Sequence, residues 1–491
     1  MSLPAEIYSV ASVRNIDRLA ISDAGISGYT LMTRAGQAAL DAVSCKNSDA
    51  QRWQVICGSG NNGGDGYVVA RLAAEKGIAV SVLAMSPPEN LSGDAATAHM
   101  DFAALGGVVA KYDGALDTEA ELLVDGLLGS GLERELEGRY ADVVVAMNAH
   151  PAPVVALDIP SGLHGDSGKV LGSAVHATMT VTFVGLKAGL FLDSGPELAG
   201  EIVYDGLGIP AECRAAERAM LRRIDDQMIS RALPRRPRGA HKGNFGHVLI
   251  VGGGPGMPGA VRLCGEAALC SGAGLVSIAT HPQHSDTISA TRPELMCHAI
   301  QTAADLESLL ARATMVAVGP GLGRCHWAQA MLDAVLDSAL PMVADADALN
   351  LLAGRGVHRD DWILTPHPGE AARLLAQDTA TVQADRVAAL ASLRVGAGGV
   401  VVLKGAGTLV SSVDGPPWLC SAGNPGMASP GMGDVLSGII AALRAQGLPS
   451  ELAATVGVQV HAKAGDSAAR QGERGLLASD LIAEIRHWVN P

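Results

Sequence analysis

The chain has 491 residues, of which 48% are hydrophobic and 3% aromatic, and its formal net charge at pH 7 is −14. This length is too great for one ordinary domain, so we expect two or three. The negative charge argues against nucleic acid or an anionic membrane as a partner. The eight cysteines form no CxxC pair, the N-terminus lacks signal-peptide features, and no apolar run is long enough to span a membrane. We therefore expect a cytoplasmic protein, and acidic α/β proteins of this kind often form symmetric homo-oligomers.

In the first half of the chain, short apolar runs alternate with helical patterns. Helices are expected at 13–40 and 65–76, and strands at 53–57, 78–84, 121–124, 154–157 and 179–184. Short apolar strands separated by helices predict βαβ units and a parallel sheet.

The pattern breaks into charge and proline between residues 211 and 238, where we place a domain boundary. Beyond it, apolar runs again predict strands, at 247–251, 275–279, 315–318, 342–344, 362–364 and 400–403. Polar or glycine-rich segments follow the strands in both halves, at the end where ligands bind in open α/β sheets. The sequence therefore predicts two α/β domains, at 1–215 and 225–491.

A glycine-rich loop follows the first strand of the first half. Gly58-Ser-Gly60-Asn-Asn-Gly63 fits the pattern G-x-G-x-x-G, which brings phosphates close to a helix start. However, Asp65 would repel a pyrophosphate there, and no acid stands near the end of the next strand to bind a ribose. We interpret the segment as a nucleotide-handling loop that is not a hydride-transfer site.

Three strand ends in the first half offer oxygen atoms, from Asn62, from Asp125, and from Asp158 with Ser161. Such hard ligands suit a hard cation. Each residue taken alone is also typical of a turn. Asp158 could in addition act as a general acid or base.

Three motifs in this order, at 61–66, 125–131 and 157–162, resemble the NAD(P)H-hydrate epimerase domain. That family has a Rossmann-like three-layer fold and interconverts the R and S epimers of hydrated NADH and NADPH. The resemblance implies that Asn62, Asp125 and Ser161 hold K⁺ and that Asp158 is the catalytic acid/base. It also implies that the hydrated cofactor contacts Asn61, Asn62, Gly63, Gly64, Asp65, Gly129, Ser130, Gly131, Leu132, Glu133, Arg134, Glu135 and Asp158.

In the second half, Gly431-Met-Gly-Asp434 directly precedes an apolar helical run. The glycines let backbone N–H groups turn inward, and the helix N-terminus adds positive potential, which together predict an anion hole. Such a hole stabilises a transferring phosphoryl group, and the acid can remove a proton from an attacking hydroxyl. The motif therefore indicates phosphoryl transfer from a nucleotide to an alcohol.

Other strand ends of the second half add charged or rigid groups. Lys404, followed by glycines at 405 and 407, is a candidate counter-charge for phosphate, or a surface lysine. His367 stands between two prolines, where it either contacts a substrate or is structural. Asp345 and Asp347 could bind Mg²⁺ indirectly or cap a helix, and for Asp347 we favour the structural role.

Five motifs, at 241–246, 319–323, 345–350, 365–370 and 424–434, resemble the ribokinase-like superfamily. Within it, they are similar to the ADP-dependent NAD(P)H-hydrate dehydratase, which would use Mg²⁺. The resemblance implies substrate contacts from Ala260, Gly321, His367 and the catalytic Asp434. It implies adenine-nucleotide contacts from Lys404, Gly405, Ala406, Gly407, Thr408 and Gly433. Pro430 departs from the small residue usual in the family, and we expect the anion-hole donors to lie from Gly431 onward.

The two resemblances together imply a cofactor-repair enzyme that epimerises NAD(P)H hydrates and dehydrates the S form with ADP, giving AMP and phosphate. The alternative is a ribokinase-like kinase of a small molecule, with an N-terminal domain that only binds a nucleotide.

Overall fold

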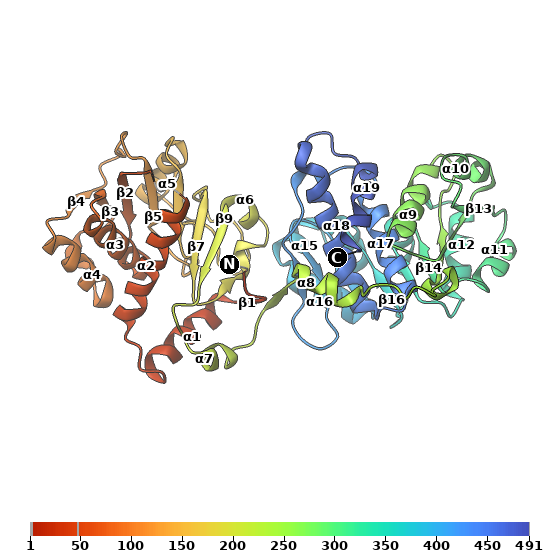
Figure 1. Ribbon diagram of the computed structural model, residues 1–491, viewed down its shortest axis with the longest axis horizontal. Helices are drawn as coiled ribbons and strands as arrows, with labels where there is room; N and C mark the ends of the chain where they lie inside the picture. The colour runs from red at the N-terminus through yellow and green to blue at the C-terminus, as the bar shows by residue number, and fades with distance from the viewer. Residues whose placement is uncertain (1–2, 47–48, 491) are drawn as a thin grey trace. The chain divides into compact units, whose positions relative to one another are not determined.

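The computed structural model describes residues 3–46 and 49–490, and the chain forms two compact units, residues 1–222 and 223–491 (Figure 1). Each unit is an α/β structure that contains a set of parallel strands. The segment 211–238, where the sequence pattern breaks, contains α7 (Ala211–Ala215), β10 (Leu221–Arg223) and α8 (Asp226–Ala232). No helix in the described part of the chain is long and apolar enough to cross a membrane.

The first unit is built on a seven-stranded parallel sheet with the order β4-β3-β2-β5-β6-β7-β9. The strands are β2 (Arg52–Cys57), β3 (Ala79–Ala84), β4 (Val108–Lys111), β5 (Leu122–Gly126), β6 (Val154–Leu157), β7 (Met179–Phe183) and β9 (Glu201–Asp205). The short β1 (Glu6–Tyr8) pairs with β8 (Leu186–Lys187) and with β10. The central strands are apolar on both sides, as expected of a sheet covered on both faces.

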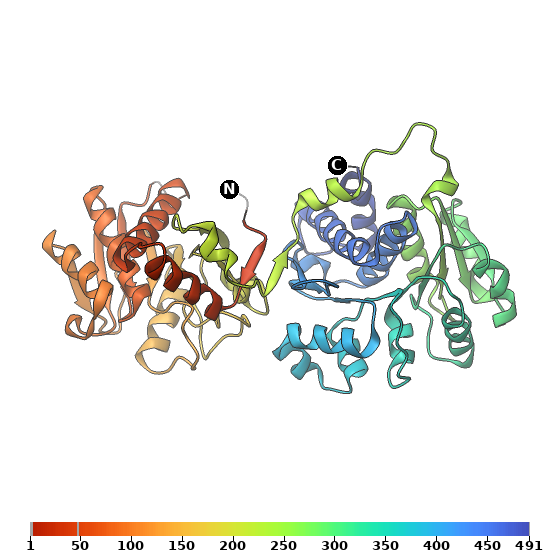
Figure 2. The same cartoon turned by 90° about the horizontal axis from the view of Figure 1, so that it is seen from below.

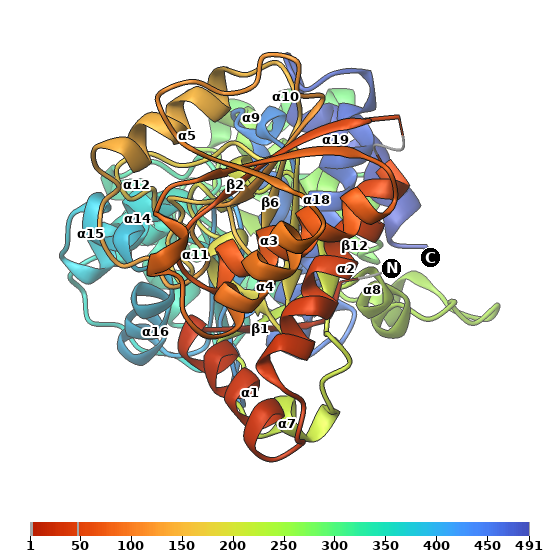
Figure 3. The same cartoon turned by 90° about the vertical axis from the view of Figure 1, so that its left-hand side faces the viewer.

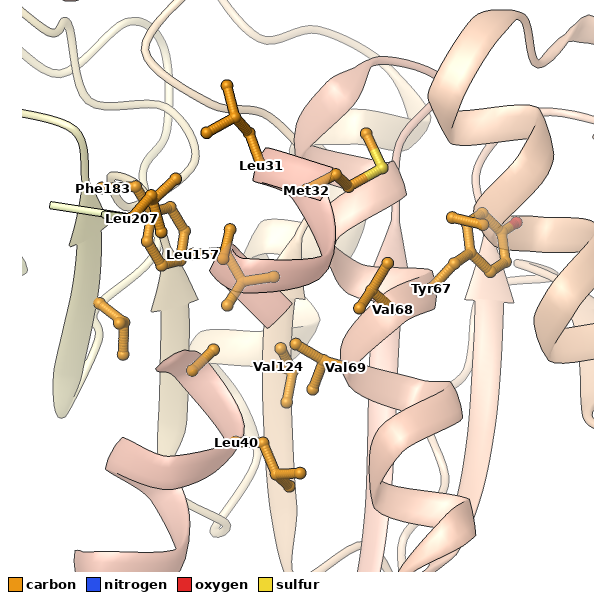
Figure 4. Packing of buried hydrophobic residues seen from close by; sticks show 14 of the residues in the cluster. Leu31, Met32, Leu40, Tyr67, Val68, Val69, Val124, Leu157, Phe183 and Leu207 are labelled. Carbon is orange, nitrogen blue, oxygen red and sulfur yellow. The ribbon is translucent and has the colours of Figure 1, made fainter. Parts of the chain in front are cut away.

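Helices cover both faces of this sheet (Figure 3). On one face lie α1 (Val10–Ser22), α2 (Gly28–Lys46), α3 (Asn61–Glu75) and α4 (Gly93–Ala104), and on the other α5 (Arg139–Ala149). In Figure 4, Val69 of α3 lies next to the strand residue Val124, and Leu31, Met32 and Leu40 of α2 belong to the same cluster. A four-residue helix, α6 (Gly195–Leu198), precedes β9.

Two predictions for this unit are wrong in detail. The expected helix 13–40 is two helices, α1 and α2, and α3 begins at Asn61 and not at residue 65. The strands β4 and β9 were not predicted. Both lie at sheet edges, β4 is mostly exposed and β9 mostly half-buried, and their apolar runs are short and end at charged residues.

The second unit has a sheet with the order β13-β12-β11-β14-β15-β16-β17-β18-β19, parallel from β13 to β17 and antiparallel after it. The parallel strands are β11 (His247–Val251), β12 (Leu275–Thr280), β13 (Met296–Ala299), β14 (Met315–Val318), β15 (Met342–Ala344), β16 (Trp362–Leu364) and β17 (Val400–Leu403). The antiparallel strands are β18 (Thr408–Val410) and β19 (Trp418–Cys420).

The residues of β11 alternate between two apolar layers, which shows how this sheet is covered. Val248 and Ile250 pack with α9 (Pro258–Cys270), α17 (Met432–Ala445) and α18 (Ser450–Ala468). Leu249 and Val251 pack with helices of the opposite face, namely α11 (Ala303–Leu310), α12 (His326–Leu336) and α13 (Ala346–Leu352). The remaining helices are α10 (Ser285–Thr291), α14 (Pro368–Leu375), α15 (Thr379–Ala384), α16 (Arg386–Ala397) and α19 (Ala478–Trp488). Figure 2 shows α17, α18 and α19 gathered in blue.

Candidate active sites

The first unit contains a cavity of about 720 Å³ at the carboxyl ends of its strands. Ten residues of the predicted site line it: Asn61, Asn62, Asp65, Gly129, Ser130, Gly131, Leu132, Glu133, Arg134 and Asp158. Gly63, Gly64 and Glu135 do not line it, and Gly63 and Gly64 are buried in the first turn of α3. The structure therefore brings most of the predicted residues together around one space.

The glycines of the loop after β2 serve close packing. A Cβ at Gly58 would stand 1.9 Å from the carbonyl oxygen of Leu127, and one at Gly63 would stand 2.1 Å from that of Gly58. Because these close contacts let the loop pack against the segment after β5, α3 can begin at Asn61, with Gly60 as its N-cap residue. Asn61 and Asn62 thus lie in the positive first turn of a helix and point to the cavity.

Asp125 and Ser161 form a buried polar pair beside the cavity, and Asn62 is buried near them. The Ser161 hydroxyl donates to Asp125 Oδ1 at 2.6 Å, and the Ser161 N–H donates to Oδ2 at 2.8 Å. Burial raises the pKa of Asp125 to about 6, although the hydrogen bonds from Ser161 oppose this. Both polar atoms of the Asn62 amide are buried without a hydrogen-bond partner in the described chain, and its backbone oxygen lies beside Gly126. An unsatisfied amide next to a buried carboxylate fits a hard cation.

Asp158 lies at the cavity wall in a strained backbone conformation, with φ of 66°. The Ser130 N–H donates to its Oδ2 at 3.3 Å, and the Lys187 ammonium forms an ion pair with its Oδ1. Lys187 is 1% exposed and also lines the cavity. Sequence reasoning missed Lys187, although a lone lysine within the apolar run 179–192 is a usable signal.

Two further acids, Asp17 and Asp65, face the same cavity. Burial raises the pKa of Asp17 to about 6, and the charge of Asp158 adds to the effect while Lys187 opposes it. Burial, helped by Asp158 and Asp17, also raises the pKa of Asp65 well above its ordinary value. Asp17 was not predicted, although it lies at helical spacing from the buried Val10 and Val13 and so interrupts an apolar face.

In the second unit, the predicted anion hole is the first turn of α17. Gly431 is the N-cap residue with φ of 90°, and a Cβ there would stand 2.5 Å from Leu263. Pro430 precedes the cap, so the N–H groups of the first turn, which have no intrahelical acceptors, begin after it. Asp434 lies in this turn, and burial followed by the charge of Asp345 raises its pKa to about 7.

Lys404 lies beside this turn and is held by acids. Its Nζ lies 2.6 Å from Asp345 Oδ1 and 3.7 Å from Glu370 Oε2, and the Ser437 hydroxyl donates to Asp345 Oδ2 at 2.8 Å. Asp345 is therefore a partner of Lys404, and its side chain does not cap α13. A Cβ at Gly433 would stand 3.4 Å from Lys404 Nζ, so the predicted residues 404, 433 and 434 meet at one place.

The remaining predicted substrate residues of this unit are Ala260, Gly321 and His367. A Cβ at Gly321 would stand 3.0 Å from that of Ala260, so these two are neighbours. The His367 ring accepts from the N–H of Gly369 at 3.0 Å and thereby caps α14, with its Nε2 3.4 Å from a Glu370 oxygen. Burial, together with Lys404 and Arg373, lowers the pKa of His367.

Backbone contacts hold the segment from Lys404 to Thr408. The buried Arg386 donates to the carbonyl oxygens of Leu403 at 3.2 Å, Lys404 at 3.3 Å and Ala406. Arg386 was not predicted, because nothing in its sequence neighbourhood distinguishes it from a surface arginine of α16. Asp347 accepts from the Gly323 N–H at 2.9 Å, which supports its structural role.

Two family models match the chain. One described as NAD(P)H-hydrate dehydratase matches residues 248–487, and one described as YjeF-related protein N-terminus matches residues 28–189. The bifunctional NAD(P)H-hydrate repair enzyme Nnr of Coxiella burnetii is 48% identical over 486 residues, which cover 99% of each chain. The enzyme of the same name from Escherichia coli K12 is 42% identical and covers all of this chain and 95% of its own.

Solved structures resemble the second unit. A ribokinase-like superfamily protein from Enterococcus faecalis V583 is 28% identical with a TM-score of 0.52, covering 55% of this chain and 95% of its own. A protein of Streptococcus mutans is 29% identical with a TM-score of 0.50, covering 54% of this chain and 98% of its own. The predicted α/β fold class with a ribokinase-like second part is confirmed.

Proposed function

Because the chain belongs to the family of bifunctional NAD(P)H-hydrate repair enzymes, we propose that it carries out both reactions of that family. The first unit interconverts the R and S epimers of hydrated NADH and NADPH. The second unit dehydrates the S epimer and consumes ADP. The combination is chemically useful, since a dehydratase limited to the S epimer would leave the R epimer unrepaired.

One observation carries the proposal for the second unit: Asp434, with its pKa raised to about 7, lies in the first turn of α17 beside Lys404. A base of this pKa suits proton transfer near neutral pH. Asp434 removes the hydroxyl proton of the hydrate, and that oxygen attacks the β-phosphorus of ADP, releasing AMP. Phosphate then leaves with its C–O electron pair, a proton leaves the adjacent carbon, and the ring double bond returns.

Other groups of the second unit are assigned to the phosphoryl group, to the hydrated nicotinamide and to the nucleotide. The first-turn N–H groups of α17 stabilise the phosphoryl group as its charge develops. Ala260, Gly321 and His367 are assigned to the hydrated nicotinamide, and Gly433 with Lys404, Gly405, Ala406, Gly407 and Thr408 to the nucleotide. In the described chain no group of three or more His, Cys, Asp or Glu side chains is arranged to hold a metal ion. Mg²⁺ would therefore be bound mainly by the phosphates, as is usual for this ion, and would neutralise their charge.

In the first unit, the 720 Å³ cavity would receive the hydrated cofactor. Asp158 faces it and is assigned as the acid/base. Inversion of the hydroxyl-bearing carbon requires one bond to that carbon to break and to re-form on the other face. Asp158 would take up the proton released as the bond breaks and return it as the bond re-forms, so that no atom is gained or lost. Asn62, Asp125 and Ser161 would hold K⁺, which would supply a fixed positive charge beside the substrate.

The test is the recovery of reduced-nicotinamide absorbance from a purified R/S mixture of NADHX. Protein and Mg²⁺ are added with ADP, with ATP or with neither, and the two epimers are followed by chromatography. Full recovery with ADP is expected. Recovery that stops at the S fraction would contradict the epimerase assignment, and a lasting phosphoester product would instead indicate the small-molecule kinase.

A further inference from the structure

The Lys187 side chain is the one cation bound directly to Asp158 in the described chain, and it belongs to no predicted site. We propose that Lys187 is a positioning residue of the epimerase cavity, which keeps a positive charge against Asp158 and aims its carboxylate at the substrate. This inference rests on the proposed epimerase function.

The hydrogen bonds of Lys187 show that it acts through Asp158. An ammonium group has three donors. Those of Lys187 go to Asp158 Oδ1, to the Thr182 hydroxyl at 3.1 Å and to the Phe183 carbonyl oxygen at 2.8 Å. All three donors are used inside the protein, so the ammonium has none left for a ligand. The other oxygen of Asp158 accepts from the Ser130 N–H at 3.3 Å, which leaves the carboxylate fixed at both ends.

The backbone of Asp158 gives a reason for such anchoring. Its φ of 66° is rare for a residue with a side chain, and such strain persists only where the surroundings hold it. The Asp158 N–H donates to the Val181 carbonyl oxygen at 2.7 Å, which fixes the backbone beside β7. Lys187 fixes the side chain, and the two anchors together present the carboxylate to the cavity.

The charges around the cavity are a second reason to assign Lys187 a positioning role. Five acids line the cavity, among them Asp17 from α1, Asp65 from α3 and Asp158 after β6. The cations lining the same space are Lys187, Arg14 and Arg134, and Asp94 and Glu133 are the other two acids. Of these cations, only Lys187 forms an ion pair with Asp158 in the described chain, so the positive charge at this wall of the cavity is fixed beside Asp158. Lys187 opposes the rise in the pKa of Asp17 and in that of Asp65, so its charge also acts on the two acids that lie near Asp158.

The test compares Lys187→Met with Lys111→Met, which makes the same change at an exposed lysine of the edge strand β4. Conversion of purified R epimer to S is followed by chromatography without ADP, over a range of pH. We expect Lys187→Met to lower kcat about 100-fold. The acid limb of its pH profile moves up by about one pH unit or more, because the Asp158 carboxylate has lost its cation. Lys111→Met should match the wild type.

A double-mutant cycle separates positioning from a merely structural role. Asp158→Asn with Lys187→Met leaves no buried unpaired charge, and it should be no slower than Asp158→Asn alone, since Lys187 acts only through Asp158. Lys187→Arg, which keeps the charge, should retain the acid limb even where kcat falls. The dehydratase rate on pure S epimer with ADP reports folding of the second unit, and circular dichroism reports folding of the whole chain.

Two results would overturn the inference. One is a kcat that falls equally at every pH in Lys187→Met, with the acid limb unmoved. The other is a double variant in which the two losses simply multiply. A wild-type protein that does not convert R to S at all would instead contradict the proposed epimerase function, so the two failures are distinguishable.

Discussion

The two sites of this protein both combine a carboxylate with a lysine, but they pair them differently. In the first unit Lys187 binds Asp158, the proposed acid/base, directly. In the second unit Lys404 binds Asp345 at 2.6 Å, and Asp434 stands beside this pair with its pKa raised to about 7. The same two residue types therefore form a direct pair in the first site, whereas in the second site the acid with a pKa near 7 lies beside a lysine that another acid binds.

The two sites differ because the lysine ammonium group contacts a different acid in each of them. A contact pair favours the charged form of its own carboxylate, whereas a nearby carboxylate without such a contact is governed by desolvation and like charge. Asp345 is such a like charge for Asp434. Variants that remove one partner at a time test this comparison.

The largest effect is expected from Asp434→Asn. Dehydration of the S epimer should fall by about 1,000-fold, because the base is lost, while epimerisation stays unchanged.

At pH 8 the variant should melt about 2 °C or more above the wild type, because ionised Asp434 is buried at a cost. This pKa is higher in the folded than in the unfolded protein, so the wild type loses stability as pH rises from about 4 to about 7. Calorimetry at pH 8 and pH 4 measures the gap, and a gap that does not shrink at pH 4 would contradict the assignment.

Lys404→Met should have the next largest effect. Lys404 lowers the pKa of Asp434, so its removal should move the acid limb of dehydration to higher pH. The KM for ADP should rise about tenfold, the cost of one lost charged hydrogen bond. The control is Lys463→Met, which removes the pair with Asp226 at 3.0 Å and the contact with the Trp488 ring, both away from Lys404. Initial rates against ADP and pH measure both effects, and an unchanged KM would remove Lys404 from the nucleotide site.

Asn62→Leu tests the cation site of the first unit with a readout independent of activity. In the wild type, KCl should raise the unfolding temperature by about 2 °C relative to choline chloride at equal ionic strength. The variant should lose this difference, because leucine keeps the volume of the side chain and removes its oxygen. An equal K⁺ effect in both proteins would place the ion elsewhere.

The smallest effects come from two glycines, one in each site. Gly63→Ala should destabilise the protein by about 2 kcal/mol, since its Cβ would stand 2.1 Å from the Gly58 oxygen. Gly433→Ala should instead add about 0.5 kcal/mol, because its Cβ meets only Lys404 Nζ and Asp345 Oδ2 at 3.4 and 3.5 Å. Urea unfolding distinguishes the two, and equal losses of stability would show that both glycines serve packing.

Local sequence patterns were sufficient for the buried strands. Val154–Leu157, His247–Val251 and Val400–Leu403 have the bounds predicted from their apolar runs, because each strand is buried on both faces. The edge strand Val108–Lys111 and the start of α3 were missed or misplaced. Their stability comes from neighbouring strands and from glycine contacts that are distant in sequence.

The sequence by itself determined the two α/β parts, the strand-end motifs and the acids Asp158 and Asp434, because each depends on a short run of residues. Only the tertiary structure decided which lysine meets which acid. Lys187 and Asp158 are separated by 29 positions, and Lys404 and Asp345 by 59. A pKa depends on burial and on charges within a few ångströms, and both arise only when the sheet brings its strand ends together.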